Sequence, residues 1–161
     1  MRPGFAVLAV DDDSNYLMLI EHAWLSIGTT NKVFQSATSG DEAIEYLKGE
    51  GEYSDRNRFP DPGLIMLDLR MPQGDGFSVL ERLKSKPEWA TIRTVVLTGS
   101  AQPDDIRKAY LLGACAYHVK PNTYEDLAKL LKAMFDYWPS CEIPQADIVA
   151  RQPKTNFSPK P

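Results

Sequence analysis

The chain has 161 residues, of which 43% are hydrophobic and 25% are charged, and its formal net charge is -4 at pH 7. These values are ordinary for a soluble globular protein, and the length suits one domain with a real core better than two. Because phosphate binding needs a basic surface, the negative balance argues against nucleic acid as the main partner. Cys115 and Cys141 make no disulfide framework. The first apolar run is too short for a signal peptide or a membrane span, so we expect a cytoplasmic protein with no membrane partner.

Five strand-like segments alternate along the chain with five helix-like segments. Apolar or β-branched runs predict the strands, and apolar residues at helical spacing predict the helices. The expected strands are residues 5–10, 32–37, 64–67, 94–98 and 116–119, and the expected helices follow them at about 14–28, 39–49, 76–85, 103–113 and 123–138. Strict alternation of the two element types implies one α/β domain with a parallel sheet and helices on both faces.

Several boundaries of this pattern carry further expectations. Either Asp13 or Ser14 is the N-cap of the first helix, and Gly28 closes it. Residues 49–63 are rich in Gly, Pro, Asp and Arg, which predicts a polar surface loop that is longer than usual. We divide the chain into a domain at residues 1–139 and a proline-rich tail at residues 140–161, which is mobile or packs on a partner.

Polar side chains follow four of the five expected strands. Asp11 and Asp12 come after the first strand, Asp68 after the third and Lys120 after the fifth, while Thr98 ends the fourth. The carboxyl ends of parallel strands meet at one edge of a sheet, so these side chains converge in one cleft. Crowded carboxylates are relieved by a divalent cation, and oxygen ligands favour Mg²⁺, with Mn²⁺ as the alternative. A lysine beside them would balance charge and could hold a phosphoryl oxygen.

Three residues in or near these motifs also have a plainer explanation. Asp68 taken alone is as well explained as an ordinary acid in a strand-to-loop connection. Asp13 is better explained as a helix-start residue than as a metal ligand. Cys115, beside the fifth strand, is expected to be a small core residue.

Four motifs together resemble one known family. They are Val10-Asp11-Asp12-Asp13, the run from Leu67-Asp68 to Asp75-Gly76, Leu97-Thr98-Gly99, and Tyr117-His118-Val119-Lys120-Pro121. In this order, over residues 5 to about 138, the chain resembles the receiver domain of the two-component response regulators. The resemblance implies a doubly wound, flavodoxin-like sheet with strand order 2-1-3-4-5.

The resemblance also implies roles for the residues of the cleft. Asp68 is the expected phosphoacceptor, which takes a phosphoryl group from a sensor histidine kinase. Asp11, Asp12 and Asp68 are expected to hold Mg²⁺ together with the backbone carbonyl of Arg70. Lys120 is expected to pair with Asp68 and afterwards with the phosphoryl group. The protein would then catalyse only its own phosphorylation and dephosphorylation, and would not be a turnover enzyme.

A conformational switch is implied in the same way. Thr98 is expected to bind a phosphoryl oxygen, and Tyr117 to move inward when Thr98 shifts. Pro121 is expected to follow a cis peptide bond, as in the family. Arg70 and Ser100 stand at positions that the family uses to tune the lifetime of the phosphoryl group.

The long loop at residues 49–63 and the helix end at residues 136–138 are similar to the phytochrome-type response regulators. The tail holds no recognisable output domain, so we expect a single-domain regulator that acts by binding a downstream protein target. The subgroup likeness implies a phytochrome-like photoreceptor kinase as donor and a homodimer as a candidate state. Two alternatives stay open. One is a receiver that binds partners without being phosphorylated. The other is a phosphatase of the haloacid dehalogenase type, which needs Asp-x-Asp where this chain has Asp68-Leu69-Arg70.

Overall fold

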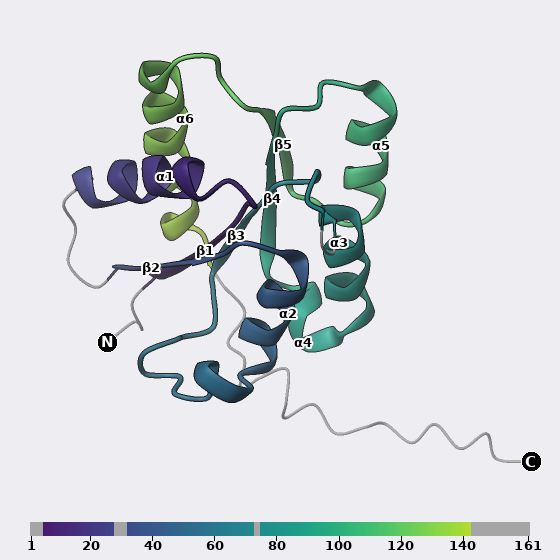
Figure 1. Cartoon of the computed structure of the whole chain (residues 1–161). Helices are drawn as coiled ribbons and strands as arrows, with labels where there is room; N and C mark the ends of the chain where they lie inside the picture. Colours follow the sequence, from purple (N-terminus) through teal and green to yellow (C-terminus); the bar gives the residue numbers. More distant parts are fainter. Residues whose placement is uncertain (1–4, 28–31, 73–74, 143–161) are drawn as a thin grey trace, which may run out of the picture.

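The computed structural model describes residues 5–27, 32–72 and 75–142. Its five strands are β1 (Phe5–Val10), β2 (Lys32–Ala37), β3 (Leu64–Leu67), β4 (Arg93–Thr98) and β5 (Ala116–Val119). They form one parallel sheet in the order β2-β1-β3-β4-β5 (Figure 1). The expected doubly wound, flavodoxin-like sheet is therefore confirmed.

Helices cover both faces of the sheet. They are α1 (Ser14–Ser26), α2 (Gly40–Lys48), α3 (Gly76–Ser85), α4 (Pro87–Ala90), α5 (Pro103–Leu111) and α6 (Tyr124–Tyr137), with short 3₁₀ turns η1 (Gly51–Tyr53) and η2 (Trp138–Ser140). Helices α1 and α6 lie on one face, and α2, α3 and α5 lie on the other (Figure 1). The sequence did not predict α4. Pro87 does end α3, but it also occupies the first turn of a new helix, which buries Trp89.

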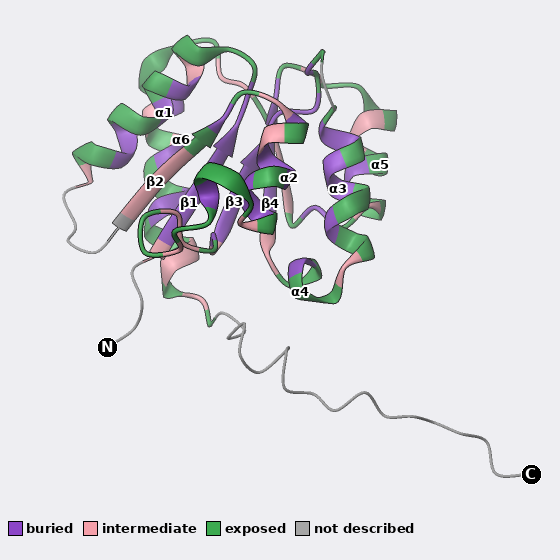
Figure 2. Cartoon of the chain, turned by 60° about the horizontal axis from the view of Figure 1, so that its bottom comes forward, coloured by how far each residue is buried: buried purple, intermediate pink, exposed green. Residues whose placement is uncertain are grey.

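Two apolar cores lie on the two sides of the sheet. Successive side chains of a strand point to opposite faces, so Val7 and Ala9 of β1 join the core under α1 and α6, whereas Leu8 and Val10 join the core under α2 and α3. Burial on both sides explains why β1 and β3 lack polar alternation. Figure 2 shows the buried residues in the strands and on the inner sides of the helices.

Side-chain caps decide where the first two helices begin. Asp13 is the N-cap of α1, because its carboxylate accepts hydrogen bonds from the backbone N–H groups of Asn15 and Tyr16. Ser39 caps α2 by accepting a hydrogen bond from the Glu42 amide at 3.1 Å. The Glu42 carboxylate accepts a hydrogen bond from the amide of residue 38, one residue before the cap, so Ser39 and Glu42 form a capping box in a shifted form.

The connection at residues 49–63 is more ordered than the sequence suggested. Tyr53 is buried and packs against Tyr46 and Phe59, with ring centroids 5.1 and 5.2 Å away. The guanidinium of Arg56 donates hydrogen bonds to the backbone carbonyls of Tyr46, Leu47 and Phe59. The prediction of a polar surface loop is therefore wrong for its aromatic residues, which extend the core beyond the end of α2.

Two further expectations are wrong. The bond between Lys120 and Pro121 is trans, which is the lower-energy isomer for an X–Pro bond, and no cis bond occurs among the described residues. Cys115 is exposed and not part of the core. It lies just before β5, an edge strand, where one side of the chain has no neighbouring strand to cover it.

Some expectations concern residues outside the described part. Gly28 is one of these, while α1 itself ends at Ser26. The tail at residues 143–161 is another, so the division at residue 139 stays a prediction. In the part of the chain that is described, no helix has the length and apolar character needed to cross a membrane.

Candidate functional site

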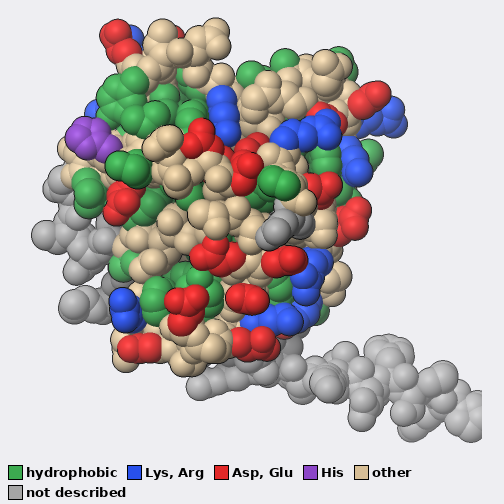
Figure 3. All heavy atoms as spheres, in the orientation of Figure 1, with side chains coloured by type: hydrophobic (Ala, Val, Ile, Leu, Met, Phe, Trp, Pro, Cys, Tyr) green, Lys and Arg blue, Asp and Glu red, His purple; other side chains and the backbone are tan. Residues whose placement is uncertain are grey.

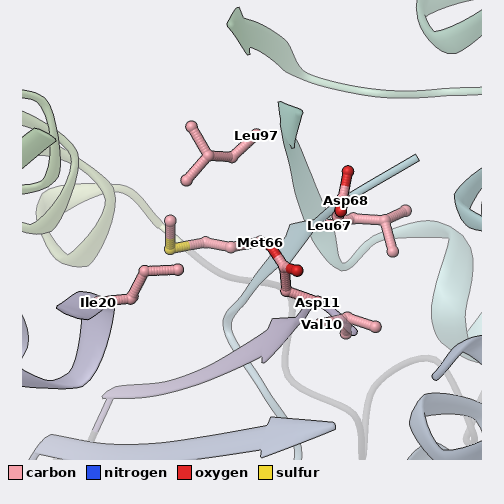
Figure 4. Close-up of a pocket in the computed structure, with 7 residues that line it drawn as sticks. All are labelled: Val10, Asp11, Ile20, Met66, Leu67, Asp68 and Leu97. Carbon is pink, nitrogen blue, oxygen red and sulfur yellow. The ribbon is translucent and has the colours of Figure 1, made fainter. Parts of the chain in front are cut away.

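Two carboxylates meet where neighbouring strands β1 and β3 end. Val10 and Leu67 are paired in the sheet, so Asp11 and Asp68 follow at adjacent positions. The backbone N–H of Asp68 donates to the carbonyl of Val10 at 2.9 Å, which fixes the two strand exits against each other. Figure 4 shows both carboxylates at one small pocket, whose other walls include Ile20 of α1 and Leu97 of β4.

Asp12 completes a group of three acids. One carboxylate oxygen from each of Asp11, Asp12 and Asp68 lies within 4.8 Å of the others. Asp11 and Asp68 are buried, with exposed fractions of 3% and 5%, while Asp12 is exposed. Burial raises the pKa of Asp11 against the opposing effect of the hydrogen bond with Lys120. Oxygen ligands that are crowded, charged and open to solvent on one side fit a hard divalent cation.

Lys120 supplies the positive charge of this site. It follows β5, and its backbone N–H donates to the carbonyl of Thr98 at 2.7 Å. Its ammonium nitrogen lies 2.7 Å from an oxygen of Asp11 and 3.4 Å from an oxygen of Asp68. Burial alone would lower the pKa of Lys120, but the two carboxylates raise it on balance, so the side chain is charged. In Figure 3, acidic side chains gather beside a basic one near the middle of the face, over the ends of β1 and β3.

Thr98 is the last residue of the neighbouring strand β4, and its side chain is fully buried. Within the described residues it has no hydrogen-bond partner, which is unusual for a buried polar group. A hydroxyl in that state can donate to an anion that arrives at the strand ends. The structure thus brings together the side chains of Asp11, Asp12, Asp68 and Lys120, as the sequence predicted. Thr98 lies at the end of the adjacent strand β4, and its backbone carbonyl is bonded to the Lys120 amide.

A second polar chain runs beside this site. The Tyr117 hydroxyl donates to the backbone carbonyl of Ser100 at 2.8 Å, and the Ser100 hydroxyl donates to the Asp105 carboxylate at 2.6 Å. The guanidinium of Arg70 binds the same carboxylate at 2.5 Å. The hydrogen bond from Ser100, with Arg70 next in effect, lowers the pKa of Asp105. Arg70 and Tyr117, which were predicted to act at the site, are therefore joined through the first turn of α5.

Sequence reasoning missed two residues that the structure places here. One is Asp105, whose only signal was an acidic pair in the first turn of α5. The other is Tyr16, whose ring centroid lies 4.3 Å from the ammonium of Lys120. Tyr16 lies 104 residues before Lys120 in the chain, so only the tertiary structure brings the two side chains together. For the backbone carbonyl of Arg70 the structure describes no contact, and its assignment as a metal ligand stays a prediction.

The chain matches the family model described as "Response regulator receiver domain" over residues 7–132. It is 34% identical over 134 residues to the probable methanogenesis regulatory protein FilR2 of Methanothrix harundinacea, covering 83% of each chain. It is also 32% identical over 137 residues to the response regulator Rcp1 of Synechocystis sp., covering 85% of this chain and 90% of the relative.

Solved structures agree with these matches. The phosphorylated cyanobacterial phytochrome response regulator RcpA superposes with a TM-score of 0.80 at 34% identity, over 88% of this chain and 99% of that one. The Mn²⁺-bound form of Rcp1 superposes with a TM-score of 0.78 at 30% identity, over the same shares. The predicted likeness to phytochrome response regulators is confirmed. The match of the family model over most of the chain, on a fold with the expected strand order, shows that the chain belongs to the response regulator receiver domain family.

Proposed function

We propose that this receiver domain signals by accepting a phosphoryl group on Asp68 from a sensor histidine kinase. One observation carries the proposal: the buried Asp68 carboxylate lies 3.4 Å from the Lys120 ammonium and within 4.8 Å of oxygens from Asp11 and Asp12. An acceptor carboxylate needs nearby positive charge to take on a phosphoryl group, and this arrangement supplies it from one side.

The transfer needs little covalent work from the protein. An oxygen of Asp68 attacks the phosphorus of a phosphohistidine, a P–O bond forms and the P–N bond breaks. The imidazole leaves with the electron pair of that bond, and Asp68 becomes an acyl phosphate. Lys120 can bind a phosphoryl oxygen as it does the carboxylates now.

Asp11, Asp12, Asp68 and the backbone carbonyl of Arg70 would hold Mg²⁺, or Mn²⁺ in its place. When bound, the cation neutralises charge on the transferring phosphoryl group. The crowding of these acids supports this assignment, because Asp11, Asp12 and Asp68 carry more negative charge than the single ammonium of Lys120 balances. The solved structure of Mn²⁺-bound Rcp1 is a further support from a similar protein.

The readout would be a change of surface. The hydroxyl of Thr98, which has no hydrogen-bond partner among the described residues, can donate to a phosphoryl oxygen on Asp68. A shift of β4 toward the acceptor would disturb the hydrogen bond between Tyr117 and Ser100. A downstream protein would then bind the altered face in preference to the unphosphorylated one. Similarity to phytochrome response regulators favours a photoreceptor kinase as the donor, and a homodimer is a state to test.

The test is phosphorylation by a small donor. We expect purified protein with acetyl phosphate and Mg²⁺ to gain the mass of one phosphoryl group, and the gain to vanish with EDTA or in Asp68→Asn. Asp136→Asn, an acid on α6 that pairs with Lys132, is the matched control and should be phosphorylated like wild type. An unshifted mass, or a shift that survives Asp68→Asn, would overturn the proposal.

The alternatives give different results in the same assay series. A receiver that works without phosphorylation would bind its partners equally with and without the donor. A phosphatase would turn over phosphate esters, but the residue two positions after Asp68 is Arg70, whose guanidinium is bound to Asp105. Position 70 therefore holds no second acid that could protonate a leaving group, so we expect no turnover of phosphate esters.

A further inference from the structure

We propose that Tyr16 is a positioning residue for phosphoryl transfer: the face of its ring braces the ammonium of Lys120 so that the ammonium stays aimed at Asp68. The inference rests on the proposed function and adds to it a residue from α1. Its observation is the 4.3 Å separation between the Lys120 nitrogen and the ring centroid of Tyr16.

The contacts of the ammonium explain why a ring is useful there. A lysine ammonium has three N–H donors. Asp11 and Asp68 take two directions, at 2.7 and 3.4 Å, and the Tyr16 ring closes a third side. The Lys120 side chain is only 20% exposed, so little room is left for water to draw the ammonium outward.

An aromatic face differs from another carboxylate in one respect. Its quadrupole attracts the cation, but it offers no strong acceptor that would compete with a phosphoryl oxygen for the N–H groups. Tyr16 can therefore limit the movement of the Lys120 side chain without occupying the N–H groups that would bind a phosphoryl oxygen. When a phosphoryl group arrives on Asp68, the ammonium is already at the correct place and can turn its donors toward the new oxygens.

The contacts of α1 hold the Tyr16 ring in its position. Tyr16 lies in the first turn of α1, and its backbone N–H donates to the Asp13 carboxylate at 3.3 Å. Asp13, the N-cap of this helix, directly follows Asp11 and Asp12 in the chain. Farther along, α1 is anchored in the core by Leu17 and Ile20. The brace and two of the proposed metal ligands thus belong to one short segment and would move together.

The hydroxyl of Tyr16 is not the part that acts. It is buried and, in the described part of the chain, has no hydrogen-bond partner. If the ring alone supports Lys120, phenylalanine should replace tyrosine, whereas a residue without a ring should not. This distinguishes a brace from a hydrogen-bonding role.

The experiment measures initial rates of phosphorylation by acetyl phosphate with Mg²⁺. In this step an oxygen of Asp68 bonds to phosphorus and acetate leaves with the electrons of the broken P–O bond. We expect Tyr16→Leu and Tyr16→Met to be slower than wild type by about five- to thirtyfold, the range of a partly desolvated cation–π contact. Tyr16→Phe should keep at least half of the wild-type rate. Tyr110→Leu, an exposed tyrosine on α5, is the control for loss of a ring elsewhere.

Two further measurements separate positioning from a structural effect. In a Lys120→Met background, Tyr16→Leu should cause no additional loss, because no ammonium remains to be placed. In NMR spectra, the ring-current shift of the Lys120 side-chain protons should be present in wild type and Tyr16→Phe and absent in Tyr16→Met, which fills similar volume without a ring.

Four results would overturn the inference: rates of both ringless variants within twofold of wild type, a Tyr16→Phe variant as slow as Tyr16→Leu, an equal loss with and without Lys120, or no ring-current shift in wild type. Failure of the proposed function looks different, because wild type itself would then gain no phosphoryl group.

Discussion

A single glycine governs how closely α3 approaches the candidate site. The backbone N–H of Gly76 donates to the carbonyl of Leu69 at 3.1 Å, which joins the start of α3 to the exit of β3. A Cβ atom at position 76 would lie 2.4 Å from the carbonyl oxygen of Asp68 and 2.7 Å from the Cα of Leu69. Both are backbone atoms next to the proposed acceptor, so they cannot yield without moving Asp68 itself.

We predict that Gly76→Ala lowers the free energy of unfolding by about 2 kcal/mol, within the usual cost of forcing extra volume into a packed site. Urea denaturation measures it. Gly99→Ala is the matched control, because a Cβ at Gly99 would meet nothing within 4 Å, and its effect should stay below about 0.5 kcal/mol. Equal stability of the two variants would contradict the steric argument.

At the scale of elements, the connection between α2 and β3 depends on one arginine. Arg56 donates hydrogen bonds to four backbone carbonyls and also binds Asp61 at 2.8 Å; the carbonyls are those of Tyr46, Leu47, Tyr53 and Phe59. Two of these carbonyls, those of Tyr46 and Leu47, lie in the last turn of α2, where the regular helical hydrogen bonds end. The side chain therefore caps the helix and holds the connection against it.

We predict that Arg56→Ala lowers the free energy of unfolding by about 2 to 4 kcal/mol, because hydrogen bonds from a charged donor are among the stronger ones and several are lost together. Arg56→Lys should recover only part of the loss, since a point charge cannot make the forked contacts. Arg58→Ala is the control: its guanidinium faces the Phe59 ring at 5.2 Å, and its loss should cost less than about 1 kcal/mol. Thermal and urea unfolding of the three variants provide the comparison, and a larger loss for Arg58→Ala would contradict the prediction.

At the scale of the whole molecule, the charged form of the buried Asp11 lowers the stability of the fold. Burial, the largest effect, raises the pKa of Asp11 above 3.8 despite the hydrogen bond with Lys120. The folded protein thus binds this proton more tightly than the unfolded chain does. Stability therefore falls as the pH rises from about 3.8 through the raised pKa, and the loss is complete above it.

We predict that Asp11→Asn is more stable than wild type at pH 7 and that the difference disappears as the pH falls through this range. Mg²⁺ should reverse the order. At about 100 times its Kd, a bound ion stabilises the folded state by about 2.7 kcal/mol, and the variant, which lacks one of the proposed ligands, should gain much less. Unfolding curves with and without Mg²⁺ at several pH values measure both effects. A variant that is less stable than wild type in EDTA at pH 7 would refute the charge argument.

The sequence alone determined the fold and most of the candidate site. Strands β1 and β3 are buried on both faces, so their unbroken apolar runs were visible without coordinates. The acids and the lysine of the site follow strands directly, and the carboxyl ends of parallel strands must share an edge. Position along the chain therefore implied position in space for Asp11, Asp12, Asp68, Thr98 and Lys120.

Only the tertiary structure decided contacts between segments whose spacing carries no period. Tyr16, at the start of α1, contacts Lys120, which follows β5. Arg70, in the connection after β3, contacts Asp105 in the first turn of α5. Arg56 looked like a loop residue until its partners at the end of α2 were visible. Patterns of apolar and polar residues within one segment of the sequence indicate which residues are buried and which follow a strand. Pairings across the fold depend on how helices settle on the sheet, and that is decided by packing of the whole core.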